Sequence, residues 1–149
     1  MNTQRKIFAI ILALGTILAN AACQKKGPSA SNDTGNLYSV PIDTIHFDFD
    51  KYNIRSDAQS SLEKGASWLK SNGNVNVVIE GNTDEWGTEE YNLALGERRA
   101  QAAKNYLSNL GVSPDRMSTI SYGESRPVDP GHSESAWAQN RRDDFKGRR

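Results

Sequence analysis

The chain has 149 residues, 36% of them hydrophobic, and its 18 Lys and Arg side chains match its 18 Asp and Glu side chains in number. This balance implies no strongly basic face, so the composition gives no support to nucleic-acid binding. The length is enough for one compact domain with its own core.

Residues 1–22 have the pattern of a secretory signal peptide. Arg5 and Lys6 precede an apolar run over residues 7–19, and small residues then lead to Cys23. The run is shorter than the ~20 apolar residues that a membrane-spanning helix needs, which favours a signal peptide over a permanent span. We therefore expect the chain to be exported.

Cys23 is the only cysteine, so it has no partner for an intramolecular disulfide. Its position directly after Ala21 and Ala22 resembles the lipobox of bacterial lipoproteins, in which the cysteine is lipidated. Three residues before the cysteine, lipoboxes usually have a large aliphatic residue, whereas this chain has Asn20. The alternative is that Cys23 is a free thiol behind an ordinary signal peptide. By the same resemblance, Gln24 in place of Asp implies the outer membrane as destination, with the domain in the periplasm.

Residues 23–41 are rich in Gly, Ser, Asn and Lys and poor in large apolar groups. This composition is typical of a flexible tether, and a coil of such length spans about 20–25 Å on average. The tether could lift a domain off a membrane. The folded domain is then expected to occupy residues 42–149.

The domain is predicted to begin with a strand and a helix. Residues 45–50 alternate apolar and polar side chains, which is typical of a strand with one buried face. A helix follows, with Ser56 as its candidate cap and Asn72-Gly73 as its stop. Its apolar face consists of small and aliphatic residues at helical spacing, namely Ala58, Leu62, Gly65, Ala66 and Leu69.

Two further strands and a longer helix follow. Residues 75–81 predict a second strand, and a helix is expected over residues 89–110, with Thr88 as cap and Gly111 as terminator. Residues 117–122 predict a third strand. Strands separated by helices indicate a two-layer α/β domain.

Arg99 is the most informative position of the longer helix. On a helical wheel with ~100° per residue it falls near the middle of an apolar sector. That sector consists of Leu95, Ala102, Ala103, Tyr106, Leu107 and Leu110. Because burial of an unpaired guanidinium is costly, an arginine at this position is expected to meet an anion.

Asp84, at the exit of the second strand, is the candidate anion. In one interpretation Asp84 and Arg99 simply pair and hold helix and loop together. In the other, both face a cleft and share a ligand whose carboxylate meets the guanidinium and whose ammonium meets Asp84. The residues alone leave both interpretations open.

Several motifs resemble OmpA-like peptidoglycan-binding domains, beginning with Asn92-x-x-Leu95-Gly96-x-x-Arg99-Ala100. Others, in the same order, resemble the Pal group of that family. These stretches are FDFDKYNI at 47–54, GNTDE at 81–85, YN at 91–92, GERRA at 96–100, SYG at 121–123 and NRR at 140–142. The resemblance implies an α/β, two-layer OmpA-like sandwich, with helices packed on one face of a small mixed sheet.

The resemblance also implies a function, which is non-catalytic binding of the peptidoglycan stem peptide through meso-diaminopimelate. By motif position, Asp84 and Arg99 would be its charged clamps, and Phe49, Asp50 and Leu95 would complete the pocket. Lysine lacks the second carboxylate of diaminopimelate, so a lysine-type peptide is expected to bind more weakly by about 2–5 kcal/mol. The Pal resemblance further implies membership of the Tol–Pal system, with TolB as a partner.

Two features depart from the family pattern. Trp86 stands where these lipoproteins commonly have arginine. After residues 140–142 the family usually continues into an apolar closing strand, whereas this chain reads DDFKGRR. Only Phe145 could anchor such a strand, which is therefore expected to be short, frayed or absent.

No residue set favours catalysis, a cofactor or a metal. His46 and His132 are not at ligand spacing, and no Gly-x-Ser-x-Gly turn is present. Asp48 and Glu80 fit outward-facing strand positions better than a pair of catalytic carboxylates. Two other functions stay open: a wall-modifying enzyme, and a structural or protein-interaction lipoprotein that does not bind the wall.

Overall fold

The computed structural model describes residues 39–149. The predicted signal peptide, Cys23 and the tether as far as residue 38 lie outside this range. The elements are β1 (Ile45–His46), α1 (Ser56–Ser71), β2 (Asn76–Asn82), α2 (Glu89–Asn109), the 3₁₀ turn η1 (Pro114–Arg116), β3 (Met117–Gly123), α3 (Glu134–Asn140) and β4 (Arg142–Arg148). Within the described range, no helix is long and apolar enough to cross a membrane.

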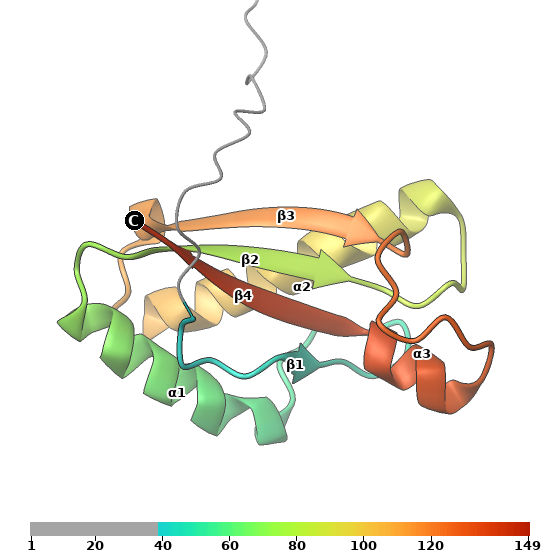
Figure 1. Cartoon of the computed structure of the whole chain (residues 1–149), viewed down its shortest axis with the longest axis horizontal. Helices are drawn as coiled ribbons and strands as arrows, with labels where there is room; N and C mark the ends of the chain where they lie inside the picture. Colours follow the sequence, from blue (N-terminus) through green and yellow to red (C-terminus); the bar gives the residue numbers. More distant parts are fainter. Residues whose placement is uncertain (1–38) are drawn as a thin grey trace, which may run out of the picture. The chain divides into compact units, whose positions relative to one another are not determined.

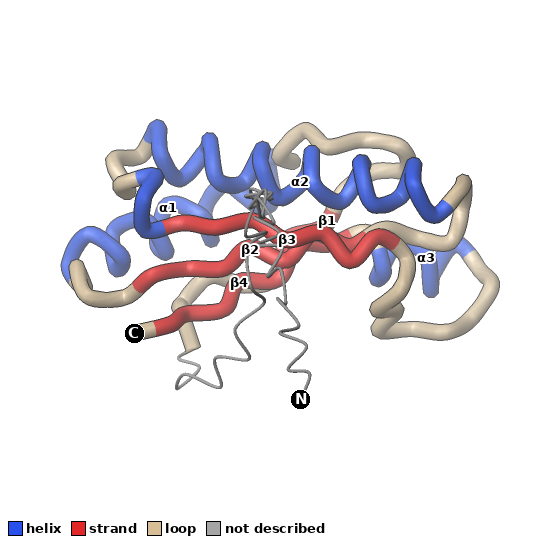
Figure 2. The backbone as a smooth tube through the Cα atoms, turned by 90° about the horizontal axis from the view of Figure 1, so that it is seen from above, coloured by secondary structure: helices blue, strands red, loops and turns tan. Residues whose placement is uncertain are grey.

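The strands form one mixed sheet in the order β1-β4-β2-β3 (Figure 1). Strand β4 runs antiparallel to both β1 and β2, whereas β2 and β3 are parallel. Helices α1 and α2 lie on the same face of the sheet (Figure 2). The predicted two-layer α/β class is confirmed.

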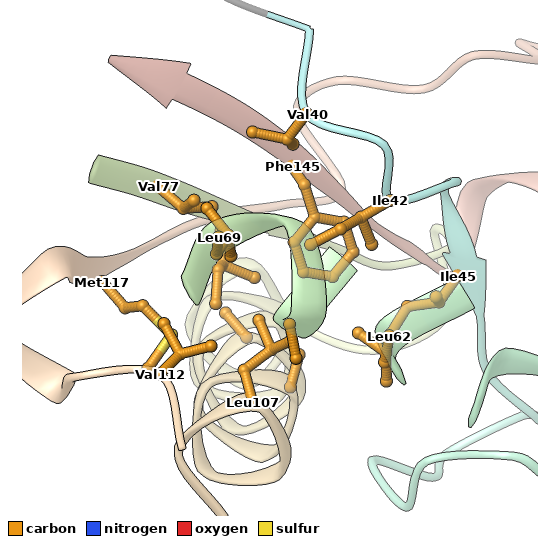
Figure 3. Close-up of a cluster of buried hydrophobic side chains, with 14 of the residues drawn as sticks. Val40, Ile42, Ile45, Leu62, Leu69, Val77, Leu107, Val112, Met117 and Phe145 are labelled. Carbon is orange, nitrogen blue, oxygen red and sulfur yellow. The ribbon is translucent and has the colours of Figure 1, made fainter. Parts of the chain in front are cut away.

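The hydrophobic core lies between the sheet and these two helices (Figure 3). Leu62 and Leu69 of α1 and Leu107 of α2 are fully buried there, and each such side chain contributes roughly 1.5–3 kcal/mol by leaving water. Val40 also belongs to this core, although the sequence assigned it to the tether. The packed part of the chain therefore begins slightly earlier than residue 42.

Two glycines let α2 approach the sheet closely. A Cβ on Gly81 of β2 would lie 2.0 Å from the carbonyl oxygen of Gly96, and a Cβ on Gly96 would lie 2.2 Å from Oγ of Ser121. Neither position has room for a side chain. The contact between the two glycines sets how near the first half of α2 lies to the ends of β2 and β3.

The prediction for the last strand is wrong. Strand β4 has seven residues and lies between β1 and β2, pairing with β2 over residues 143–148 and with β1 at Arg142 and Asp143. Asp143, Phe145 and Gly147 alternate on its buried face, and Phe145 packs into the core. The polar composition did not indicate this strand because it is held by its backbone ladder with β2, while Phe145 alone anchors it in the core.

The first strand is shorter than predicted. The sheet keeps only Ile45–His46, and residues 49–50 form a turn. Phe49, which alternation placed on the buried face, is 56% exposed. At the next element, Ser56 is the first helical residue rather than the cap, because Arg55 occupies the cap position. Helix α3 has no counterpart in the predicted elements, although Ser133 caps it by accepting a hydrogen bond from the N–H of Ala136.

Candidate ligand-binding site

A pocket of about 270 Å³ lies among the loop after β1, the loop after β2 and the start of α2. Its lining is Phe49, Asp50, Asp84, Trp86, Gly87, Tyr91 and Leu95. The structure thus brings together four of the five residues that the sequence assigned to a binding site. Arg99, the fifth, does not line the pocket.

The loop after β1 presents Phe49 and Asp50 to the pocket. Asp50 has a φ of 55°, in the left-handed region that aspartate tolerates better than most residues. The Tyr91 hydroxyl donates a hydrogen bond to the Asp50 carboxylate, and this bond raises the pKa of Tyr91. Tyr91 lies in the first turn of α2, and its backbone N–H donates a hydrogen bond to Oγ1 of the capping residue Thr88 at 3.2 Å. The capped helix start therefore fixes one wall of the pocket.

Asp84 is buried beside the pocket and is already paired. Its Oδ2 accepts a hydrogen bond from Nη1 of Arg141 at 3.1 Å, and its Oδ1 accepts one from the N–H of Trp86 at 3.3 Å. Arg141 also donates to the carbonyl of Phe47 at 3.2 Å and to Oε1 of Glu134 at 2.5 Å. Burial of Arg141 lowers its pKa, but the hydrogen bonds to Glu134 and Asp84 outweigh this effect, so the pKa of Arg141 lies above its usual value. The sequence included Arg141 only as part of a motif and gave it no role.

The prediction that Arg99 is buried is confirmed, but its contacts differ from those expected. Its guanidinium donates to three backbone carbonyls, those of Lys51 at 2.8 Å, Asn82 at 2.8 Å and Asp48 at 3.3 Å. Among the ion pairs of the described residues, Asp84 pairs with Arg141 and not with Arg99. The direct Arg99–Asp84 pair considered from the sequence is therefore corrected.

The three carbonyls connect the Arg99 guanidinium to the backbone segments next to the pocket lining. Two of them belong to Asp48 and Lys51, the residues on either side of Phe49 and Asp50. The third belongs to Asn82, two residues before Asp84 in sequence. A guanidinium has five N–H groups, so two remain for other acceptors in addition to these three bonds. One side chain of α2 thus holds the loop after β1 and the end of β2, from which the second pocket loop starts.

Burial lowers the pKa of Arg99 to about 10, and the negative charges of Asp143 and Asp84 oppose that shift. The guanidinium consequently stays charged at neutral pH. The ring of Phe47, 5.0 Å from the guanidinium carbon, covers another side of it. The positive charge of Arg99 thus faces backbone carbonyl dipoles and the charge of the nearby Asp84, without a contact ion pair.

Asp143 of β4 is the least expected charged residue near this site. It is fully buried, and neither carboxylate oxygen has a hydrogen-bond partner among residues 39–149. Its burial raises its pKa well above the usual value, and the positive charge of Arg99 opposes the rise. Sequence reasoning missed this residue because it placed Asp143 in a frayed terminus.

Residues 46–141 match the OmpA family, and the chain belongs to that family. It is 45% identical to the peptidoglycan-associated lipoprotein of Pasteurella multocida, with 93% of this chain and 96% of the relative covered. It is 54% identical to the protein of the same name from Pseudomonas putida, over 68% of this chain and 60% of that one. These relatives place the chain among the peptidoglycan-associated lipoproteins.

Solved structures agree with this grouping. The peptidoglycan-associated lipoprotein of Burkholderia pseudomallei matches with a TM-score of 0.69 and 47% identity, over 70% of this chain and 89% of that one. The C-terminal domain of Helicobacter pylori MotB matches with a TM-score of 0.66 at 24% identity, over 72% of this chain and 86% of that one. The second likeness shows a shared fold alone.

Proposed function

We propose that this chain is a lipoprotein that binds peptidoglycan non-covalently and links it to the outer membrane. One observation carries the proposal. The pocket between the two loops and α2 combines the carboxylates Asp50 and Asp84 with apolar walls, and the buried Arg99 guanidinium bonds the backbone of the loop that carries Phe49 and Asp50. The relatives share the name peptidoglycan-associated lipoprotein, and that name describes no enzyme.

The ligand that suits this pocket is the zwitterionic end of meso-diaminopimelate in the stem peptide. Its ammonium would meet the carboxylates of Asp84 and Asp50, and its methylene groups would pack on Phe49 and Leu95. Its carboxylate would be attracted by the charge of Arg99, which has two N–H groups beyond its three carbonyl bonds. All five residues identified from the sequence thus have a role in the proposal.

Calorimetric titration of the purified protein with two stem peptides tests this assignment. The lysine-type peptide should bind about 2 kcal/mol more weakly than the diaminopimelate type, or about thirtyfold. We expect the lower end of the range because the three carbonyls already hold the guanidinium when no carboxylate is bound. Equal affinities for the two peptides would contradict the role of Arg99.

Asp50→Asn is the matched control for the ammonium. Asp50 is exposed, and its side-chain hydrogen bond goes to Tyr91, which is also exposed. The loss of the Asp50 charge should therefore leave the fold intact. Because both peptides carry the ammonium, both should bind more weakly to this variant, by about tenfold.

A protein-interaction lipoprotein without wall binding is the second candidate. The Arg141–Asp84 ion pair favours it, since Asp84 is satisfied with no ligand present. Under this alternative neither stem peptide would bind in the titration.

The proposal extends to the membrane anchor and to partners. Cys23 would carry the lipid, which requires two or more acyl chains for firm anchoring. The Tol–Pal system and TolB follow from the Pal resemblance as proposed partners. Intact-mass measurement of the membrane fraction tests the anchor, because the Cys23→Ser protein should lack both the acyl mass and the outer-membrane location.

A further inference from the structure

Trp86 lies at the edge of the pocket with 53% of its surface exposed, although it contributes to the pocket lining. Its ring meets that of Trp137 edge-on, with 5.3 Å between centroids and 77° between planes. Trp86 follows β2, whereas Trp137 lies in α3. The exposed indole is therefore supported from a distant part of the chain.

A chain of hydrogen bonds fixes the supporting ring. Nε1 of Trp137 donates to Oε1 of Glu85 at 2.8 Å, and Nδ1 of His132 lies 2.8 Å from the same carboxylate. These bonds from His132 and Trp137 lower the pKa of Glu85. The backbone of Trp86 is held in turn by Asp84. An exposed aromatic side chain that is oriented in advance loses little conformational entropy when a ligand packs on it.

A second cavity, of about 260 Å³, adjoins the same loop. Consecutive loop residues alternate between the two cavities: Asp84 and Trp86 line the first, whereas Thr83 and Glu85 line the second. Hydroxyl, carboxylate and amide groups dominate the polar lining of the second cavity, so it can accept hydrogen bonds from a ligand rich in O–H and N–H donors. Glu85 connects this cavity to the Trp86–Trp137 pair.

We propose that Trp86 is a sugar-stacking residue, on which a pyranose ring of the glycan strand packs while the stem peptide occupies the first pocket. The inference rests on the proposed function, since the stem peptide is covalently attached to an N-acetylated sugar. A pyranose has a flat face of C–H groups that matches an indole, and hydroxyl groups at its rim that suit the lining on the Glu85 side. Trp86 would then make this chain prefer glycan-bearing ligands over free peptide.

The test compares two ligands that differ only in the sugar. Titrating the purified protein with a diaminopimelate stem peptide, and with the same peptide attached to its disaccharide, should give about tenfold tighter binding for the second. In the Trp86→Ala protein the two ligands should bind with equal affinity, and circular dichroism should show that this protein is still folded. Tyr52→Ala, which removes an exposed aromatic ring outside the pocket lining, should keep the ratio.

The readout is the ratio of the two affinities, because Trp86 also borders the peptide pocket. If the free peptide binds but the sugar adds nothing, or if Trp86→Ala keeps the full ratio, the sugar proposal is overturned and wall-peptide binding stands. If neither ligand binds the unaltered protein, the proposed function itself fails, and the sugar proposal fails with it.

Discussion

A single arginine side chain holds together the loops that form the pocket. The Arg99 guanidinium bonds the backbone carbonyls of Asp48 and Lys51, in the loop after β1, and of Asn82, the last residue of β2. A lysine ammonium has three donors on a point charge and cannot match a planar fork. Arg99→Lys should therefore lower the free energy of unfolding by about 3 kcal/mol, because buried carbonyls and a buried charge lose partners.

Urea denaturation measures this loss, and Arg98→Lys is the matched control. Arg98 is the adjacent residue on the exposed side of α2, where its guanidinium lies near the rings of Tyr52 and Tyr91. Its replacement should change stability by less than about 0.5 kcal/mol. Similar losses for the two variants would show that the three carbonyl bonds of Arg99 contribute little.

Asp143 makes stability depend on pH in a direction opposite to that of most carboxylates. Burial raises its pKa in the folded state above the ordinary 3.8, so the folded chain holds this proton where the unfolded chain has released it. The free energy of unfolding should thus fall as pH rises above about 4, by up to about 1.4 kcal/mol per pH unit until the folded pKa is reached.

Asp143→Asn isolates this effect, since every other titrating group is common to both proteins. Urea midpoints measured at increasing pH should show the unaltered protein losing stability relative to the Asn variant. Parallel pH curves for the two proteins would mean that Asp143 titrates normally.

At the scale of elements, the Gly81–Gly96 contact sets the position of α2 on the sheet. Gly81→Ala would place a Cβ 2.0 Å from the Gly96 carbonyl oxygen, which is backbone and cannot turn aside. The helix must shift, so thermal or urea unfolding should show a loss of about 2–3 kcal/mol. Gly73→Ala is the control, because no atom lies within 4 Å of its Cβ, and it should be neutral or slightly stabilising. A Gly81 variant as stable as the Gly73 variant would contradict this close packing.

The sequence predicted elements well where local signals were strong. Helix α2 begins at Glu89 after Thr88 and is followed by Gly111 with a φ of 92°, as cap and terminator residues indicated. It predicted β4 badly because that strand is held by pairing with β1 and β2, which no local pattern of polar residues reveals. Phe49 is exposed for a related reason, because the chain leaves the sheet after His46 to form the pocket loop.

The candidate site could be predicted as a set of residues but not as a set of contacts. Helical periodicity correctly placed Arg99 among buried side chains, and the family motifs indicated Asp84, Asp50 and Leu95, which the fold brings to one pocket. The partners could not be predicted, because backbone carbonyls leave no trace in a sequence pattern. The Asp84–Arg141 pair joins residues 57 positions apart and depends on how α3 and β4 close the domain.

At the scale of the whole molecule, the core and the pocket lie in different places. One face of α1 and of α2 packs into the core, whereas the pocket lies where two loops meet the start of α2. The core and the site are therefore supported by different residues of the same helix. Leu107 lies in the core, whereas Leu95 lines the pocket about three turns earlier.

Co-sedimentation of the purified protein with isolated diaminopimelate-type sacculi is the most direct test of wall binding. The unaltered protein should pellet with the sacculi and return to the supernatant when free diaminopimelate stem peptide is added in excess. The Asp50→Asn protein, folded but weakened in the pocket, should pellet to a clearly smaller extent. An unaltered protein that stays in the supernatant, or that pellets equally in the presence of excess peptide, would contradict recognition of the wall through this pocket.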